Sequence, residues 1–295
     1  MSQWDGKSKG TLLGYKIFIF LIKQFGVRSA YTLLYFVAAY YFVFHPKSFR
    51  SVYFYLRNRH GYGTLRSLCY VYKTYYVFGQ TIIDKIAISA GLREQFTYEF
   101  DGIEVLKESL AKKQGGILIS AHVGNFEIAE KFFADIDVDF RINVVTVDQE
   151  HTAIKEYLEQ VSPNSGTKLI KISEDMSHVF QINEALSNNE LICFTGDRYF
   201  EGSKTLQAEL LGQTADFPAG PFLIASRLQA PLVFVYVMKE KGLHYHLYAR
   251  EAKDVKRRNV DSYLNAYTKS VESILRRYPL QWFNFFDFWS RDSTK

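Results

Sequence analysis

Short apolar runs alternate with charged segments of helical periodicity from about residue 96 onward. Apolar runs of strand length predict strands at residues 117–120, 142–147, 168–172, 191–195, 232–237 and 244–248, and an extended segment at 206–211. Helical spacing predicts helices at residues 103–112, 125–133, 152–161, 176–187, 219–228 and 261–277. Strands that alternate with helices form a mainly parallel sheet with helices on both faces. We therefore expect an α/β fold with a mainly parallel or mixed central sheet flanked by helices.

A sixteen-residue run without a charge occupies residues 29–44, with Lys23 and Arg28 before it and Lys47 and Arg50 after it. At 1.5 Å per residue such a helix covers about 24 Å, less than the roughly 30 Å hydrocarbon layer of a bilayer. Its many Tyr and Phe side chains and basic flanks favour an anchor at the membrane interface, facing anionic headgroups on the cytoplasmic side. We expect a marginal span or a deeply embedded helix. The alternative is a buried helix hairpin without lipid contact.

Charge is distributed unevenly along the 295 residues, which carry a net charge of +5. Residues 1–90 hold twelve Lys and Arg against two acids, a balance of +10, so residues 91–295 carry −5. The positive balance of this part favours an anionic partner, and its interleaved apolar runs indicate a membrane surface rather than nucleic acid. We expect a basic, aromatic-rich, helical membrane-associated region at 1–90 and an α/β domain at 91–295.

The two cysteines, Cys69 and Cys193, lie in apolar surroundings without the spacing of a metal site or a disulfide framework. We expect buried, inert thiols in a reducing compartment. His244 and His246 share a predicted strand but have no third ligand nearby in the sequence. No metal site is predicted.

A histidine followed five residues later by an acid occurs three times, beginning at His122, His151 and His246. The second pair lies in a predicted helix and the third in a predicted strand, where positions five apart face opposite ways. His122 alone ends an apolar run of strand length, with Gly124 at a turn before its acid, Glu127. A carboxylate beside one imidazole nitrogen leaves the other nitrogen to act on a substrate hydroxyl. The pattern predicts such a pair; the alternative is a loop histidine bonded to the backbone.

Asp197 and Arg198 follow the predicted strand 191–195 as His122 follows the predicted strand 117–120. Ligands of open α/β sheets bind beyond the carboxyl ends of the strands. We therefore expect all three residues at the ligand-binding edge of the sheet. For Asp197 and Arg198 the alternative is a surface ion pair at a strand exit.

Three sequence blocks carry a resemblance to a known family: ILISAHVGNFE, ICFTGDRYFEGS and LLGQTADFPAGPFLIASRLQAPLVFVYV. Their order and spacing resemble the bacterial lipid A biosynthesis acyltransferases, which include lauroyl and myristoyl transferases and belong to the lysophospholipid acyltransferase superfamily. The resemblance covers nearly the whole chain. It implies an enzyme that moves a fatty acyl chain from acyl carrier protein to a hydroxyl of a glycolipid or lysolipid. The cytoplasmic face of the bacterial inner membrane is the implied location, and neither a metal nor a cofactor is implied.

The resemblance also implies roles for the residues of the first block. His122 would be the general base that takes the proton from the acceptor hydroxyl, and Glu127 would orient the imidazole. Gly124 and Asn125 would shape the turn and offer hydrogen-bond donors to the tetrahedral oxyanion. The substrate itself is the nucleophile, and the sequence has no GxSxG motif.

Asp197 and Arg198 would border the acceptor site, because a guanidinium suits a phosphate or carboxylate. The chain departs from the family where an arginine-containing segment often follows the histidine block, since it has NVVTVDQEHT there. An aminolipid, a lysophospholipid or an aryl polyene-type lipid therefore stays open as the acceptor, as does a catalytically silent lipid-binding protein of the same fold. The C-terminal aromatic run QWFNFFDFW is expected to pack against the N-terminal helices, with an acyl-chain or membrane surface as the alternative.

Overall fold

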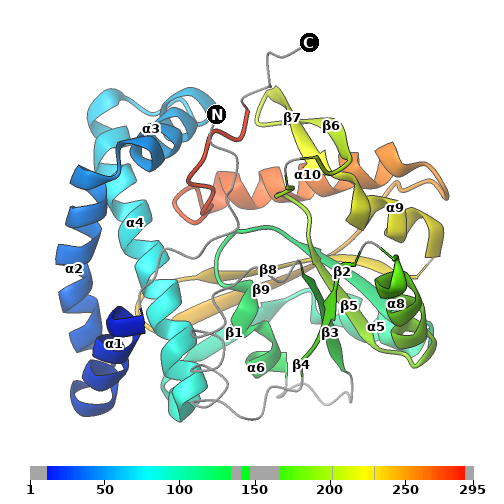
Figure 1. The fold of residues 1–295 in the computed structure, drawn as a ribbon, viewed down its shortest axis with the longest axis horizontal. Helices are drawn as coiled ribbons and strands as arrows, with labels where there is room; N and C mark the ends of the chain where they lie inside the picture. The colour runs from blue at the N-terminus through cyan, green and yellow to red at the C-terminus, as the bar shows by residue number, and fades with distance from the viewer. Residues whose placement is uncertain are drawn as a thin grey trace.

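A seven-stranded sheet forms the centre of the computed structural model (Figure 1), which describes residues 12–133, 141–146, 167–173, 175–200, 202–228 and 230–289. The strand order is β1-β9-β8-β2-β5-β3-β4, and only β8 and β9 pair antiparallel. The strands are β1 Thr97–Asp101, β2 Gly116–Ser120, β3 Ile142–Thr146, β4 Thr167–Lys171, β5 Leu191–Thr195, β8 Leu232–Lys239 and β9 His244–Glu251. A separate antiparallel hairpin pairs β6 Thr205–Leu210 with β7 Gln213–Pro218.

Helices cover both faces of the sheet. Successive side chains along β2 point to opposite faces, so neighbouring residues of this strand pack against different helices. Ile117 and Ile119 belong to a core shared with α8 Ser177–Ser187, α9 Ala219–Leu228 and α10 Val260–Arg277. Leu118 belongs to a second core shared with α5 Ile103–Ala111 and α6 Ala129–Phe133. All five residues of β2 are buried, as expected for a central strand of a parallel sheet.

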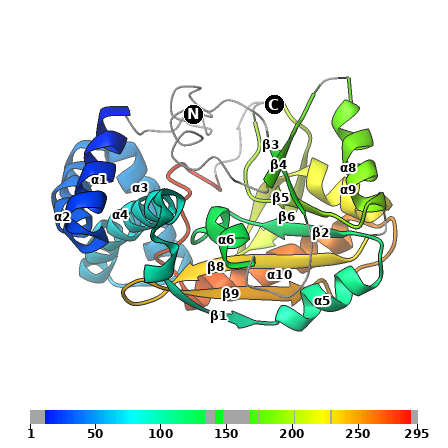
Figure 2. The same cartoon turned by 90° about the horizontal axis from the view of Figure 1, so that it is seen from below.

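Four helices from the N-terminal region stand beside the sheet (Figure 2): α1 Leu12–Phe25, α2 Val27–Phe44, α3 Pro46–Phe54 and α4 Thr64–Ala87. They contribute to both cores, for example through Val71 in one and Ile83 in the other. The hydrophobic cores therefore contain residues from either side of position 90. The division into two domains at that position stays a prediction.

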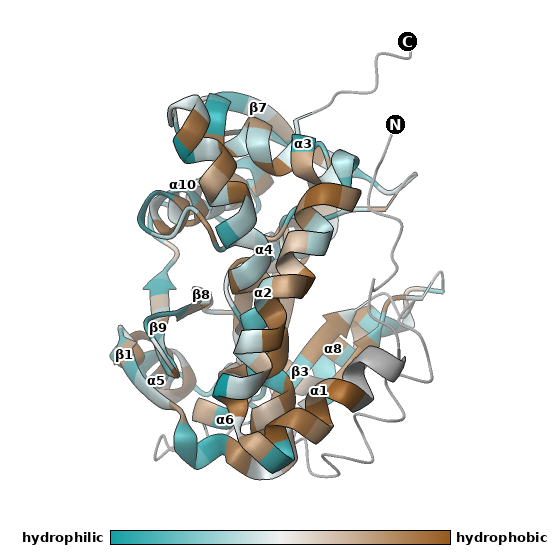
Figure 3. Cartoon of the chain, turned by 90° about the vertical axis from the view of Figure 1, so that its left-hand side faces the viewer, coloured by the Kyte–Doolittle hydropathy of each residue, from teal (hydrophilic) through white to brown (hydrophobic). Residues whose placement is uncertain are grey.

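Helix α2 is long and apolar enough to cross a membrane, and no other helix among the described residues is. Its buried residues form a stripe along one side, Val27, Ala30, Tyr31, Leu34 and Ala38. The other side exposes large apolar side chains, including Phe36 at 73 % and Phe44 at 65 %. Figure 3 shows hydrophobic residues along α1 and α2 on the side of the molecule away from the sheet.

The predicted α/β fold with a mainly parallel sheet is confirmed, and strand 191–195 and helix 219–228 have the predicted bounds. Strands β1 and β7 were not predicted, because each is only partly buried and has at least one acidic residue instead of a continuous apolar run. The predicted helix 125–133 is a 3-10 turn, Phe126–Ile128, followed by the short helix α6. The predicted helix 152–161 lies outside the described residues. Cys193 is buried as expected, but Cys69 is exposed on α4, so that expectation was wrong.

Candidate active site

His122 and Asp197 meet at the carboxyl edge of the sheet because their strands are neighbours. The register of β2 and β5 pairs Ser120 with Thr195, and each candidate residue lies two positions further along. His122 Nδ1 is 2.7 Å from Asp197 Oδ1, and the backbone N–H of His122 also donates to Oδ2 at 3.0 Å. Asp197 thus holds both the ring and the main chain of His122.

The Asp197 carboxylate is buried, with 1 % exposure, and accepts two further hydrogen bonds. Trp282 Nε1 and Asn284 Nδ2 donate to Oδ2 at 3.2 and 3.1 Å. Burial opposes ionisation, but the neighbouring His122 and Arg198 outweigh it and lower the pKa of Asp197 to about 2. An ionised carboxylate can only accept, so the proton of a neutral imidazole lies on Nδ1 and the lone pair on Nε2.

His122 keeps 29 % of its side chain exposed, so a substrate can reach it. Burial lowers the pKa of His122 below its ordinary value of 6.5, and the positive charge of Arg198 lowers it further. The carboxylates of Asp197 and Glu127 oppose this shift without reversing it. At neutral pH the imidazole is therefore uncharged and can accept a proton.

The predicted role of His122 as general base makes the activity depend on pH through this imidazole. Because only the neutral form accepts a proton, activity should fall on the acid side with a midpoint below 6.5. In Arg198→Gln the loss of a positive charge should move that midpoint to higher pH. Profiles of kcat/KM against pH for both proteins test this, and a midpoint that moves to lower pH in the variant would contradict it.

Glu127 does not make the contact predicted for it. Its carboxylate forms an ion pair with Lys85 of α4, and 60 % of its side chain is exposed. Lys85 is the main reason that the pKa of Glu127 is lowered, so this carboxylate is charged at neutral pH. It still acts on His122 at a distance, because its charge raises the pKa of the imidazole. The structure therefore brings Glu127 near His122 but gives the hydrogen bond on Nδ1 to Asp197.

Gly124 and Asn125 form the tight turn that follows His122. Gly124 has a φ of +60°, and a Cβ there would lie 2.1 Å from the carbonyl oxygen of Val237. The N–H of Gly124 donates to Gln281 O at 2.8 Å, and the N–H of Asn125 donates to Val237 O at 2.7 Å. The Asn125 amide donates to the Thr81 carbonyl and to the Tyr245 hydroxyl. These donors bond within the protein, and a role of Gly124 or Asn125 at the oxyanion stays a prediction.

A family model described as bacterial lipid A biosynthesis acyltransferase matches residues 70–291, more than half of the chain. The chain belongs to the bacterial lipid A biosynthesis acyltransferase family. None of the curated proteins matches it in a sequence comparison. Family membership implies an acyltransferase of lipid A biosynthesis, with an acyl donor and a lipid A precursor as acceptor. The N-terminal apolar helix α2 is consistent with membrane association.

The C-terminal segment of this acyltransferase supplies a part of the site that the sequence analysis missed. The N–H of Phe283 donates to the carbonyl of His122 at 2.9 Å, between the two residues, Trp282 and Asn284, that donate to Asp197. Phe283 and Phe285 also pack on Phe78 of α4, with ring centroids 4.9 and 5.0 Å apart. Packing against the N-terminal helices, the expected role of this segment, is confirmed.

Arg198 is held by the same C-terminal segment. Its Nε donates to Asn284 Oδ1 and its Nη2 to the Phe283 carbonyl, each at 2.7 Å. Burial lowers the pKa of Arg198 to about 10, so it stays charged at neutral pH. The burial of Asp197 excludes the surface Asp–Arg pair, and its carboxylate lies against Nδ1 of His122. A contact of Asp197 or of Arg198 with the acceptor stays a prediction.

The two other histidine–acid matches do not form a second site in the part of the chain that the structure describes. His246 pairs with Glu99 of β1, with Nδ1 and Oε1 2.6 Å apart, and not with the acid five residues after it. His151 lies outside the described residues. The described ranges contain no group of three His, Cys, Asp or Glu side chains that could hold a metal ion.

Proposed function

We propose that this acyltransferase moves a fatty acyl chain from the thioester of acyl carrier protein to a hydroxyl of a lipid A precursor or related glycolipid, with His122 as general base. The hydrogen bond from His122 Nδ1 to the ionised Asp197 carries the proposal, because it leaves a basic Nε2 on an imidazole that is neutral at pH 7.

In the proposed reaction, Nε2 takes the proton of the acceptor hydroxyl while the hydroxyl oxygen attacks the thioester carbonyl. The C–O bond forms, and the tetrahedral intermediate then collapses with cleavage of the C–S bond. The leaving thiolate takes the proton from the imidazolium, which restores neutral His122. Asp197 stabilises the imidazolium while it exists and keeps the ring in place. The acceptor is the nucleophile, so the protein forms no covalent intermediate.

Glu127 is proposed as a second, electrostatic stabiliser of the imidazolium. Its negative charge favours protonated His122 through space, and its ion pair with Lys85 fixes where that charge lies. Glu127 therefore assists the base without orienting it. Arg198 is proposed to attract an anionic group of the acceptor towards the same edge of the sheet, since its charge already acts on His122.

The proposed location is the cytoplasmic face of the bacterial inner membrane, as a peripheral protein or through a single N-terminal span. The exposed side of α2 supports it, because Phe36, Val43 and Phe44 would otherwise leave a large apolar surface in water. The flanking basic residues Arg28 and Lys47 suit anionic headgroups.

The proposal is tested with the purified full-length protein in detergent, an acyl carrier protein thioester and a lipid A precursor. Mass spectrometry is expected to find the acceptor heavier by one acyl chain and free acyl carrier protein in equal amount. Thioester consumption with only an aminolipid, a lysophospholipid or an aryl polyene-type acceptor would support the alternative acceptors instead. That alternative is motivated by the altered acceptor blocks, NVVTVDQEHT and GDRYFEG. No thioester consumption with any acceptor would contradict the proposed chemistry.

A further inference from the structure

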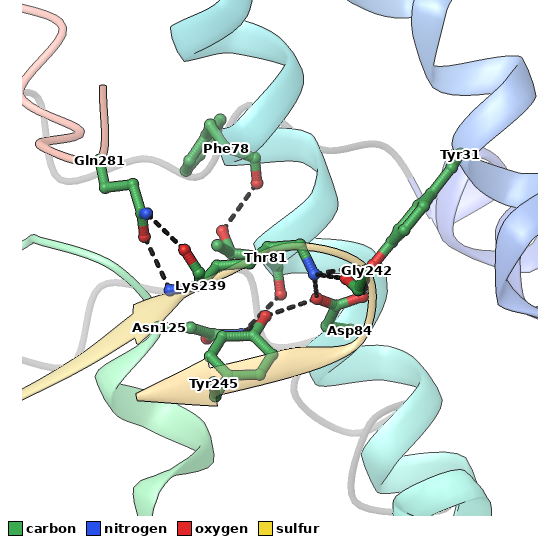
Figure 4. Close-up of polar contacts among 9 residues, drawn as sticks. All are labelled: Tyr31, Phe78, Thr81, Asp84, Asn125, Lys239, Gly242, Tyr245 and Gln281. Carbon is green, nitrogen blue, oxygen red and sulfur yellow. Dashed lines mark hydrogen bonds and ion pairs between the residues drawn. The ribbon is translucent and has the colours of Figure 1, made fainter. Parts of the chain in front are cut away.

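A buried ion pair lies beside the turn of the active site and takes no part in the proposed reaction. Asp84 of α4 and Lys239 of β8 are 2.6 Å apart, and their side chains are 0 % and 3 % exposed. Figure 4 shows the pair between α4 and the β8–β9 hairpin, with Tyr31 and Tyr245 directed at the same carboxylate. Two charges in such surroundings persist only when their hydrogen-bonding capacity is filled.

Each donor of the ammonium group has a partner. Lys239 Nζ donates to Asp84, to the Tyr31 hydroxyl at 3.0 Å and to the Gly242 carbonyl at 2.8 Å. The Asp84 carboxylate accepts from Lys239 and from the hydroxyls of Tyr31 and Tyr245. The cluster therefore joins α2, α4, β8 and β9 at one point, and its geometry is fixed on all sides.

One member of the cluster continues into the active site. The Tyr245 hydroxyl donates to Asp84 and accepts from Asn125 Nδ2 at 3.3 Å, while Asn125 also donates to the Thr81 carbonyl of α4 at 2.9 Å (Figure 4). Asn125 is 6 % exposed and ends the turn that begins at His122. Tyr31, by contrast, contacts the ion pair and, among the residues that the structure describes, makes no hydrogen bond to this turn.

Helix α4 thus holds the histidine block at two places. Thr81 of α4 accepts a hydrogen bond from Asn125, and Asp84 of α4 is linked to Asn125 through the Tyr245 hydroxyl. Lys85 of α4 forms the ion pair with Glu127. A catalytic base loses much of its effect when its position moves by even about 1 Å. The last turns of α4 therefore fix the position of the histidine block.

We propose that Tyr245 is a positioning residue for acyl transfer, which fixes the His122 turn by linking Asn125 to the buried Asp84–Lys239 pair. The inference rests on the proposed role of His122. It separates the two tyrosines, which both donate to the Asp84 carboxylate but accept from different partners. Tyr31 accepts from Lys239, whereas Tyr245 accepts from Asn125.

The test compares Tyr245→Phe with its matched control Tyr31→Phe in the full-length protein, with acyl carrier protein thioester as donor. Both variants lose a hydroxyl that donates to Asp84 and should lower the midpoint of thermal unfolding to a similar extent. Tyr245→Phe should also lower kcat roughly 10- to 100-fold with an acceptor KM within about twofold of wild type. Tyr31→Phe should keep kcat within about twofold. An equal effect of both variants on kcat, or none, would overturn the inference.

Asn125→Leu provides an independent check, because leucine fills a similar volume and cannot donate. It should lower kcat at least as much as Tyr245→Phe, because it also breaks the bond to the Thr81 carbonyl. The double variant should lower kcat no further than Asn125→Leu alone, since both changes break the Asn125–Tyr245 link. Fully additive losses would show two separate effects and overturn the inference. A parallel His122→Gln variant reports on the proposed function. Retained acyl transfer in His122→Gln would overturn both the proposed function and this inference. Loss of transfer in His122→Gln, together with equal kcat values of Tyr245→Phe and Tyr31→Phe, would overturn only the inference.

Discussion

Replacing Asp197 with asparagine is expected to lower the rate of acyl transfer about 10³- to 10⁴-fold in a protein that still folds. The Trp282 and Asn284 donors at Oδ2 hold an oxygen at that position, which turns the amide nitrogen of the variant towards His122. Nδ1 would then accept, the ring proton would move to Nε2, and the base would be blocked. Single-turnover rates of thioester consumption, with circular dichroism to verify the fold, measure the effect.

Glu127→Gln is the matched control for that substitution, because it also exchanges a carboxylate for an amide of equal size. It removes a charge that acts on His122 through space, while the hydrogen bond on Nδ1 is retained. Its loss of rate should therefore be smaller than that of Asp197→Asn. A larger loss in Glu127→Gln would give Glu127 the orienting role that the sequence pattern predicts for it.

Replacing Lys239 with methionine is expected to destabilise the fold by about 3–5 kcal/mol, the usual cost of leaving one charge of a buried pair without its partner. Asp84 is fully buried, and burial already raises its pKa against the effect of Lys239. Unfolding in guanidinium chloride measures the change. In the double variant Asp84→Asn/Lys239→Met most of the stability should return, because no uncompensated charge is left. A double variant less stable than Lys239→Met would contradict this account.

The instability of Lys239→Met should also depend on pH. Without the ammonium group the folded-state pKa of Asp84 rises further above its unfolded value of about 3.9. A group with a raised folded-state pKa stabilises the fold below its unfolded pKa and loses that contribution as pH rises through the folded value. The deficit relative to wild type should therefore be smaller at pH 5 than at pH 7.

The sequence predicted which residues stand at the edge of the sheet, but not which of them touch. His122 and Asp197 each follow a recognisable buried strand, so both were assigned correctly to the carboxyl edge. Their contact depends on β2 lying next to β5, although β3 and β4 come between them along the chain. Periodicity reports burial and direction but not strand order, so nearness in sequence favoured Glu127 over Asp197.

The C-terminal donors were missed for a similar reason. Trp282 and Asn284 are separated from Asp197 by 85 and 87 positions, and they lie in a run whose many aromatic residues indicate packing. The one signal in the sequence was a polar Asn284 inside that apolar run, which a buried partner would explain. The Asp84–Lys239 pair gave no signal, because isolated charges 155 positions apart carry no pattern.

The role of His122 as the base is tested most directly by transfer from a labelled acyl carrier protein thioester to a lipid A precursor, measured for wild type and His122→Gln. Glutamine keeps a polar side chain but cannot take up a proton at neutral pH. The acylated product is expected from the wild type, while the variant should stay folded and transfer at least about 10²-fold more slowly. Transfer by His122→Gln at a rate near that of the wild type would contradict the account.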